Sequence, residues 1–249
     1  MNTVLITGAS AGFGLETAKL FLSKGWRVVA GMRSPREDLL PASEHLEIVK
    51  LDVTDPDSIA AAISATGPID VLVNNAGIGW MNAVEGTPME TLRGLFETNT
   101  FGPVAMMQAV LPQMRERRSG VIINVSSSVT LKPLALLSAY TASKAALNAL
   151  TEVSALELAP FDVRVRIVLP GRAPTTSFGD TARARVQGAG GFPEPYLPVV
   201  KAVFDAWAEE SASEVTQASD VAEAVWWAAT DATSPLRIPA GADAVALVW

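Results

Sequence analysis

The sequence predicts an α/β fold in which helices cover both faces of a central, mostly parallel, seven-stranded sheet. Short apolar runs alternate with helix-like stretches from one end of the 249-residue chain to the other. The apolar runs are continuous, which is typical of parallel strands buried on both faces. No proline-, serine- or glycine-rich linker and no charge block divides residues 1–249, so one domain is expected.

The expected strands and helices follow one another in the order strand, helix, strand. The strands are predicted at residues 3–6, 27–31, 46–51, 71–73, 121–125, 163–168 and 244–248. The first helix is expected at residues 14–24, before Gly25, and a second helix opens at Asp55. A third opens with "TPME", where Thr87 and Glu90 have capping-box spacing. This order predicts a doubly wound sheet with its ligand at the carboxyl ends of the strands.

Composition excludes several classes of function. The formal net charge is −7 and no basic stripe is present, so a nucleic acid partner is not expected. The chain has no cysteine, and its only histidine is His45, which removes the usual zinc ligand sets. No apolar run reaches the roughly 18 residues of a membrane span, and the chain enters a strand directly after Met1. We therefore expect a cytoplasmic protein with no metal and no membrane partner.

The stretch "TGASAGFG" has two interpretations. Gly8, Ser10 and Gly12 match Gly-x-Ser-x-Gly, the turn that presents a nucleophilic serine in many hydrolases. Together with Gly14, the same glycines match a turn whose bare backbone approaches a pyrophosphate. The only histidine lies 35 residues after Ser10 and nothing downstream can replace it as a base, so the phosphate-binding interpretation is favoured.

A second motif, "SAYTASKAAL", can carry acid/base chemistry. Tyr140 and Lys144 are four residues apart in a helical segment, so they share one face. An ammonium about 4 Å from the phenol contributes roughly 4 kcal/mol at an effective dielectric near 20, which could lower the tyrosine pKa by up to about 3 units. Burial of the phenol opposes this shift. The pair could therefore do work that histidine does in other enzymes.

In order and spacing, these motifs resemble the short-chain dehydrogenase/reductase family. The likeness extends over essentially the whole chain and includes "TGASAGFG", "LDVTD", "NNAG", "ETNTFG", "NVSSS", "YTASK" and "LPG". It implies a Rossmann-like, doubly wound, three-layer sandwich. It also implies that Tyr140 exchanges a proton with the substrate oxygen, and that Lys144 lowers the Tyr140 pKa and binds the nicotinamide ribose. Ser127, thirteen residues before Tyr140, would hydrogen-bond the carbonyl. Asn99 would hold a water through its backbone, in a locally distorted helix.

The resemblance further implies a nicotinamide dinucleotide, and the residues after the second strand favour NADP(H) over NAD(H). Met32 stands where an NAD-specific site has an acidic residue, and Arg33 with Ser34 suits a 2′-phosphate. The expected cofactor-binding residues are Gly8, Ser10, Gly12, Phe13, Gly14, Arg33, Ser34, Asp52, Val53, Asn75, Ala76, Gly77, Tyr140, Lys144, Pro170, Gly171, Ala173 and Thr175. The stretch "PGRAPTTSF" departs from the family pattern at Pro174, so the geometry of this loop over the nicotinamide stays open.

Residues 172–213 are expected to form a lid over the substrate, because glycines and prolines interrupt this segment. The expected pocket is apolar and suits a hydrophobic or aromatic ketone. Its candidate residues are Trp80, Leu137, Phe178, Phe192 and Tyr196. In the family, the helices matching residues 89–117 and 138–159 form dimer interfaces, so a homodimer or homotetramer is expected.

The sequence thus predicts an NADPH-dependent carbonyl reductase that also runs as an alcohol dehydrogenase on a small-molecule carbonyl or alcohol. The alternative is a catalytically silent NADP(H)-binding sensor with the same fold. The natural substrate, the stereochemical preference and the physiological direction stay open, as does the choice between dimer and tetramer.

Overall fold

A single parallel sheet organises the chain. The computed structural model describes residues 1–209 and 215–248. In this part of the chain seven strands pair in the order β3-β2-β1-β4-β5-β6-β7, and every neighbouring pair is parallel. The predicted α/β, doubly wound fold is confirmed, and the sheet is wholly parallel.

For every strand but the last, the observed bounds agree closely with the predictions. The strands are β1 (Thr3–Thr7), β2 (Arg27–Met32), β3 (Leu46–Lys50), β4 (Val71–Asn74), β5 (Gly120–Val125), β6 (Val163–Pro170) and β7 (Arg237–Ala240). The helices are α1 (Gly12–Ser23), α2 (Pro56–Thr66), α3 (Met89–Phe96), α4 (Gly102–Arg117), α5 (Ser138–Leu158), α6 (Phe178–Gly188), α7 (Leu197–Glu209), α8 (Ala218–Thr230) and α9 (Ala242–Val245).

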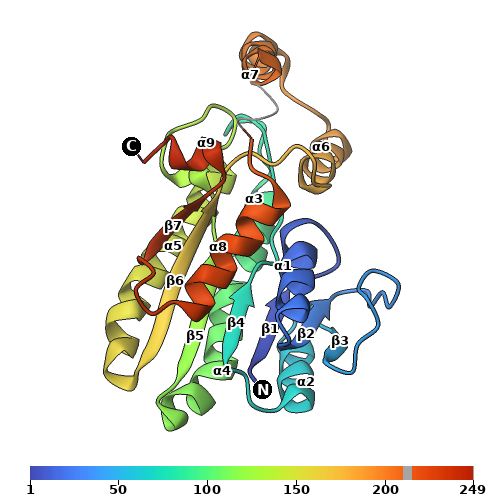
Figure 1. Cartoon of the computed structure of the whole chain (residues 1–249). Helices are drawn as coiled ribbons and strands as arrows, with labels where there is room; N and C mark the ends of the chain where they lie inside the picture. Colours follow the sequence, from blue (N-terminus) through green and yellow to red (C-terminus); the bar gives the residue numbers. More distant parts are fainter. Residues whose placement is uncertain (210–214, 249) are drawn as a thin grey trace.

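Helices cover both faces of the sheet and bury two apolar clusters (Figure 1). On one face, Phe21 of α1 and Val225 of α8 pack on β1 and β2. On the other face, α2, α4 and α5 contribute Ile59, Met106 and Leu158. Burial of apolar surface on both sides explains the apolar runs of the central strands β1, β4 and β5.

The direction of the strand order reverses between β1 and β4, and this places a crevice at their carboxyl ends. The loops after β1, β4, β5 and β6 all emerge at this edge of the sheet. Helices α6 and α7 lie beyond the same edge (Figure 1). Most residues proposed from the sequence for the site fall on these loops or on the helices that follow them.

The predicted strand at residues 244–248 is wrong. The last strand is β7, with the sequence "RIPA", and the chain then turns at Gly241, with φ of +94°, into α9. Strand β7 lies at the edge and pairs only with β6, so Pro239 is tolerated there despite its missing N–H group. A short edge strand with a proline carries a weak sequence pattern.

The predicted capping box at Thr87 and Glu90 is also wrong. Helix α3 begins at Met89 with Pro88 as its N-cap, and no side chain caps it. The Thr87 hydroxyl instead donates to the carbonyl oxygen of Ala83 at 2.8 Å and accepts from the indole Nε1 of Trp80 at 3.0 Å. The turn before the helix therefore uses the hydroxyl that the prediction assigned to the cap.

Candidate active site

The glycine-rich turn joins β1 to α1 and leaves helix N–H groups open. Gly8 and Gly12 have positive φ angles of +69° and +53°, which residues with a side chain rarely adopt. A Cβ atom on Gly14 would lie 2.4 Å from the carbonyl oxygen of Gly8. No side chain caps α1, and Ser10 is exposed. The turn can therefore accept an anion at the helix N-terminus, where backbone N–H groups and the helix dipole attract negative charge.

Strand β4 is fastened to this turn by Asn75. Its Nδ2 atom donates to the carbonyl oxygens of Thr7 at 3.0 Å and Gly8 at 3.2 Å. The Thr7 hydroxyl accepts from the backbone N–H groups of Asn75 and Ala76. These bonds fix the two strand ends that flank the crevice.

Arg33 and Ser34 follow β2 and are exposed, as required for contact with a ligand. Asp52 follows β3, and its Oδ1 accepts from the backbone N–H and the hydroxyl of Thr54. These bonds lower the Asp52 pKa, and the positive charge of Arg33 lowers it further. Arg33 and Asp52 therefore lie within electrostatic reach of each other. Val53 is buried and packs closely on Gly102. A Cβ atom added to Gly102 would lie only 2.8 Å from Val53 Cγ2.

The structure brings Ser127, Tyr140 and Lys144 together. Ser127 follows β5, whereas Tyr140 and Lys144 lie one turn apart in α5, and all three are buried. Ser127 hydrogen-bonds the Tyr140 phenol, which lowers the tyrosine pKa. The Lys144 Nζ atom donates to the carbonyl oxygen of Val125 at 2.9 Å.

The predicted fall of the Tyr140 pKa toward neutrality is contradicted in this structure. Burial raises the Tyr140 pKa to about 12, and the hydrogen bond from Ser127 only partly opposes this effect. Burial also lowers the Lys144 pKa to about 8. Desolvation disfavours both charged forms, and it is the largest cause of each shift. Through neutral pH the phenol therefore keeps its proton.

Asn99 lies in a π-helical turn, Glu97–Phe101, between α3 and α4, so the expected distortion is present. Its side chain is fully buried and donates to the carbonyl oxygen of Ile78 and accepts from the Ile78 N–H. Gly77 lies between Asn99 and Lys144. A Cβ atom on Gly77 would be 3.3 Å from Asn99 Oδ1 and 3.5 Å from Lys144 Nζ.

The loop after β6 is held by residues that the sequence interpretation missed. Pro170 ends β6, and the Gly171 N–H donates to the Thr216 hydroxyl and to the carbonyl oxygen of Ala240. The Arg172 N–H donates to Asp243 Oδ2 at 2.6 Å, and the Thr216 hydroxyl donates to Asp243 Oδ1 at 2.6 Å. No local pattern could identify these partners, because they lie on distant segments.

Beyond these anchors the loop turns back on itself. The carbonyl oxygen of Ala173 accepts from the Thr176 backbone and hydroxyl, while Pro174 and Thr175 are exposed. Thr176 comes closest to the glycine turn. A Cβ atom added to Gly12 would lie 3.6 Å from the Cβ atom of Thr176. The loop thus reaches across the crevice to the turn after β1.

Aromatic side chains gather around Tyr140. Trp80 and Phe192 pack with Tyr140 and Val186, and the ring centroid of Phe178 lies 5.8 Å from that of Tyr140. The remaining two pocket candidates, Leu137 and Tyr196, belong to a neighbouring cluster. Phe192 packs against both clusters, so it links the two groups of residues.

The segment expected as a lid contains α6, a 3₁₀ turn and α7, while residues 210–213 lie outside the described part of the chain. Two polar contacts fasten it to the loop after β4. Asn82 Nδ2 donates to the carbonyl oxygen of Gly191 at 3.0 Å, and the Tyr196 hydroxyl donates to Glu85 Oε2 at 2.9 Å. The segment is therefore held against the loop after β4, and the Phe178 ring of α6 lies beside Tyr140.

A surface hollow of about 380 Å³ lies elsewhere, along α5 and the first half of β6. Arg164 lines it but donates to the carbonyl oxygens of Ala228, Ala229 and Asp231, so it caps the end of α8. The hollow holds none of the predicted site residues. In the described residues no group of three or more histidine, cysteine or acidic side chains could hold a metal. No helix within this part of the chain has the length and apolarity to cross a membrane.

Comparisons with known proteins extend over nearly the whole chain. A family model described as short chain dehydrogenase matches residues 2–185. Retinol dehydrogenase 8 from Homo sapiens is 37% identical over 224 residues, covering 82% of this chain and 72% of that protein. A solved short-chain dehydrogenase from Streptomyces avermitilis has a TM-score of 0.82 at 35% identity, covering 100% of this chain and 92% of that one. A short chain dehydrogenase from Burkholderia cenocepacia J2315, solved in complex with NADP, has a TM-score of 0.77 at 29% identity, covering 99% of this chain and 91% of that one.

Proposed function

The chain belongs to the short-chain dehydrogenase/reductase family, and we propose that it is an NADPH-dependent carbonyl reductase that also runs as an alcohol dehydrogenase. The observation that carries this proposal is the meeting of Ser127, Tyr140 and Lys144 beside Gly77, at the carboxyl edge of the sheet. These side chains supply a hydrogen-bond donor, a proton donor and a cation within one buried site.

The residues after β1 and β4 fit a dinucleotide. Gly8, Gly12 and Gly14 keep the backbone bare, and the uncapped N-terminus of α1 provides N–H groups for phosphate. When bound, the nicotinamide supplies the hydride that reduces the carbonyl carbon. Asn75, Ala76 and Gly77 would line the same crevice, next to the Lys144 ammonium.

In the reductive direction Tyr140 donates its phenol proton to the carbonyl oxygen, and Ser127 hydrogen-bonds that oxygen. A Tyr140 pKa near 12 keeps the donor protonated at neutral pH. The Lys144 ammonium stabilises the phenolate left after proton transfer. Asn99 would hold a water through its backbone, and that water resupplies the proton. In the oxidative direction the same groups work in reverse, with Tyr140 as the base.

The preference for NADP(H) over NAD(H) rests on Arg33 and Ser34. Both are exposed after β2, and a planar guanidinium suits a 2′-phosphate. Asp52 and Val53 would contact the adenine. The structurally similar Burkholderia enzyme was solved with NADP, which supports the same preference here. The loop with Pro170, Gly171, Ala173 and Thr175 would close over the nicotinamide.

We propose a hydrophobic or aromatic ketone, or the corresponding secondary alcohol, as substrate. Trp80, Phe178 and Phe192 surround Tyr140, and residues 172–213 would form a lid over them within a single catalytic domain. The similarity to a retinol dehydrogenase supports an apolar substrate. The outer face of α5 exposes Leu150, which favours a homodimer or homotetramer through this helix.

Turnover assays test the proposal. Purified protein with NADPH and a panel of aryl ketones, ketoesters and aldehydes should consume cofactor, and Tyr140→Phe should reduce turnover at least 100-fold while NADPH binding persists. Binding of NADPH without turnover of any carbonyl would favour the silent sensor instead. Labelling of Ser10 by a serine-directed phosphonate would support the hydrolase interpretation.

A further inference from the structure

We propose that Asn148 is a positioning residue that holds Ser127 in place for catalysis through the hydroxyl of Thr130. The inference rests on the proposed function, because it concerns the hydroxyl that would bind the substrate carbonyl. Asn148 is not part of any motif that identified the site.

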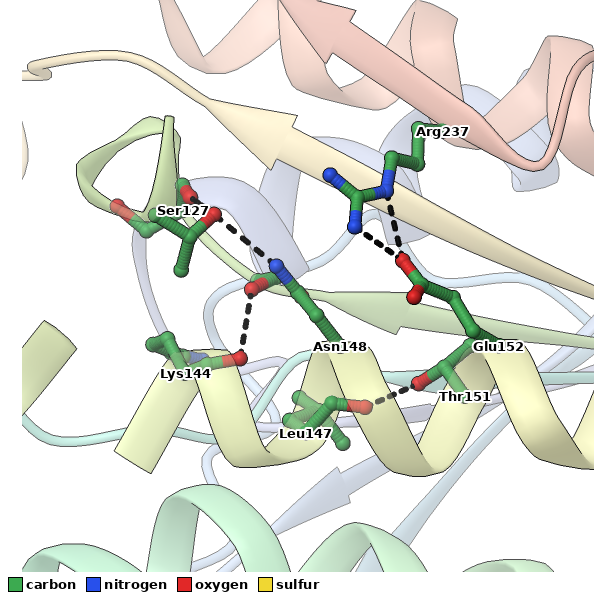
Figure 2. Close-up of polar contacts among 9 residues, drawn as sticks. Ser127, Lys144, Leu147, Asn148, Thr151, Glu152 and Arg237 are labelled. Carbon is green, nitrogen blue, oxygen red and sulfur yellow. Dashed lines mark hydrogen bonds and ion pairs between the residues drawn. The ribbon is translucent and has the colours of Figure 1, made fainter. Parts of the chain in front are cut away.

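The contacts form a two-step bridge from α5 to the loop after β5, and Figure 2 labels the residues at its two ends, Asn148 and Ser127. Asn148 Nδ2 donates to Thr130 Oγ1 at 3.0 Å, and Thr130 Oγ1 donates to the carbonyl oxygen of Ser127 at 2.9 Å. A hydroxyl has a single proton to donate, and Thr130 uses it on Ser127. The contact with Asn148 therefore requires a donor, which the amide Nδ2 supplies.

The bridge fixes the backbone that carries the Ser127 hydroxyl. The carbonyl oxygen of Ser127 also accepts from the Thr130 N–H at 3.3 Å, and the Ser127 hydroxyl accepts from the Val129 N–H at 3.3 Å. These contacts are long for N–H donors, whereas the hydroxyl bond from Thr130, at 2.9 Å, lies within the usual range. Asn148, through Thr130, therefore strengthens the tightest restraint on this turn.

The bridge also connects Ser127 to the helix that carries its partners. Tyr140, Lys144 and Asn148 follow one another at intervals of four residues in α5, so neighbouring members lie one turn apart along one side of the helix. Lys144 faces β5 through its bond to Val125, and Asn148 faces the turn that follows β5. Helix α5 thereby contributes to the spacing between the Ser127 hydroxyl and the Tyr140 phenol.

Stability by itself does not explain an asparagine at this position. The side chain is 4% exposed, and within the described residues its Oδ1 atom has no hydrogen-bond partner. A buried acceptor without a partner destabilises a fold, whereas leucine has a similar shape and no such atom. The useful contact of Asn148 is therefore the one that it makes with Thr130.

Paired variants test the proposal in the complete protein with NADPH and the best ketone of the panel. Asn148→Leu and Thr130→Val should each lower kcat about 10- to 100-fold, since displacement of a catalytic group by about 1 Å can reduce rates this much. The KM for NADPH should change less than about 2-fold. Thr130→Ser keeps the hydroxyl and should retain nearly full activity.

A matched control is Thr151→Val, which alters the same helix without touching the Ser127 turn. The Thr151 hydroxyl is fully buried and bonds Leu147 and Asn124. This variant should lower the melting temperature and leave kcat within about 2-fold of the wild type. An equal loss of kcat in Thr151→Val would overturn the proposal in favour of a general packing effect.

The decisive comparison uses Ser127→Ala as background. If Asn148 acts through Ser127, Asn148→Leu should change kcat less than about 2-fold in that background, because coupled residues are not additive. A full additional loss would overturn the proposal. Exchange of the Val129 and Thr130 amide hydrogens should be faster in Asn148→Leu and unchanged in Thr151→Val, and unchanged exchange in Asn148→Leu would also overturn it.

Failure of the proposed function is recognised separately. If the wild type reduces no carbonyl, the proposed function fails, and the amide exchange still tests the bridge. If the wild type is active but Asn148→Leu and Thr130→Val match it, only the positioning role fails.

Discussion

Lys144 donates a hydrogen bond from Nζ to the carbonyl oxygen of Val125, the last residue of β5, across 2.9 Å. Only 4% of the lysine is exposed, and burial lowers its pKa to about 8. The charged amine is thus held at the end of a strand in a site that disfavours its charge. An ammonium kept there by the fold is expected to reduce stability at neutral pH.

The free energy of unfolding of the cofactor-free protein should therefore rise between about pH 8 and 10.5. In this window folded Lys144 has lost its proton, whereas in the unfolded chain, with the ordinary pKa of 10.5, it still binds one. The unfolded state binds more protons, so rising pH favours folding by at most about 1.4 kcal/mol per pH unit. Urea unfolding from pH 7 to 10 measures the slope.

Lys144→Met is the comparison for this titration and should lack that slope. Tyr140 acts in the opposite sense, because its folded pKa of about 12 exceeds the ordinary value of 10.0. The stability that Tyr140 contributes to the folded state is lost as the pH rises from about 10 to 12. The urea measurements therefore stop at pH 10. Parallel pH profiles for the wild type and Lys144→Met would refute the role of Lys144.

Gly14→Ala should destabilise the protein and abolish NADPH binding. The new Cβ atom would lie 2.4 Å from the carbonyl oxygen of Gly8 and 2.5 Å from Asn75 Nδ2, so the turn after β1 must move. Overpacking of this kind destabilises folded proteins by about 1–3 kcal/mol. Calorimetry and titration with NADPH would measure both effects.

Gly94→Ala in α3 is the matched control, because nothing lies within 4 Å of its Cβ position. It should stabilise the protein by roughly 0.5–1 kcal/mol, as expected for alanine in a helix. NADPH affinity should stay as in the wild type. Tight NADPH binding by Gly14→Ala would show that the cofactor does not use this turn.

Most of the fold could be predicted from local sequence patterns. Where the prediction was wrong, the cause is also local. Strands β1, β2, β4 and β5 carry apolar runs because both faces of the sheet are covered, whereas β3 and β6 include charged residues. Strand β7 has four residues, one of them Pro239, and pairs on one side only, so its pattern was weaker than that of the apolar stretch at 244–248. The last part of that stretch follows α9, and Val245 is exposed.

The site was predictable where chemistry and spacing coincide in a short segment. Ser127, Tyr140 and Lys144 fall within 18 residues, and motifs fixed their positions. The anchors of the loop after β6 could not be found in this way, since Thr216 and Asp243 meet it from 45 and 71 residues away. The Tyr140 pKa was also out of reach, because burial depends on packing that no motif describes.

Arg33→Ala should raise the KM for NADPH about 10-fold and leave the KM for NADH within about 2-fold. Arg33 is exposed after β2, where its guanidinium would pair with the 2′-phosphate that only NADPH carries. Steady-state kinetics with both cofactors measure the ratio. Arg36→Ala is the control. Arg36 already pairs with Asp38 at 2.6 Å, so its loss should leave the KM for NADPH unchanged. Equal losses for NADPH and NADH would contradict the assignment of Arg33.

Asp243→Asn should raise the KM for NADPH about 10-fold and lower kcat, although Asp243 lies in α9, far from the motifs. Its two oxygens accept from the Arg172 N–H and the Thr216 hydroxyl, each at 2.6 Å, and so hold the loop after β6. The amide of asparagine keeps only one acceptor oxygen, and its NH₂ group would face either the Arg172 N–H or the Thr216 hydroxyl, which are both donors. The hydrogen bonds lost or weakened are bonds to a charged group, and such bonds contribute about 1.5–3 kcal/mol each. Asp231→Asn removes the same charge at the end of α8, where Asp231 bonds Thr233, and should leave NADPH binding intact. If the two variants bind NADPH equally well, then Asp243 does not organise the loop for the cofactor.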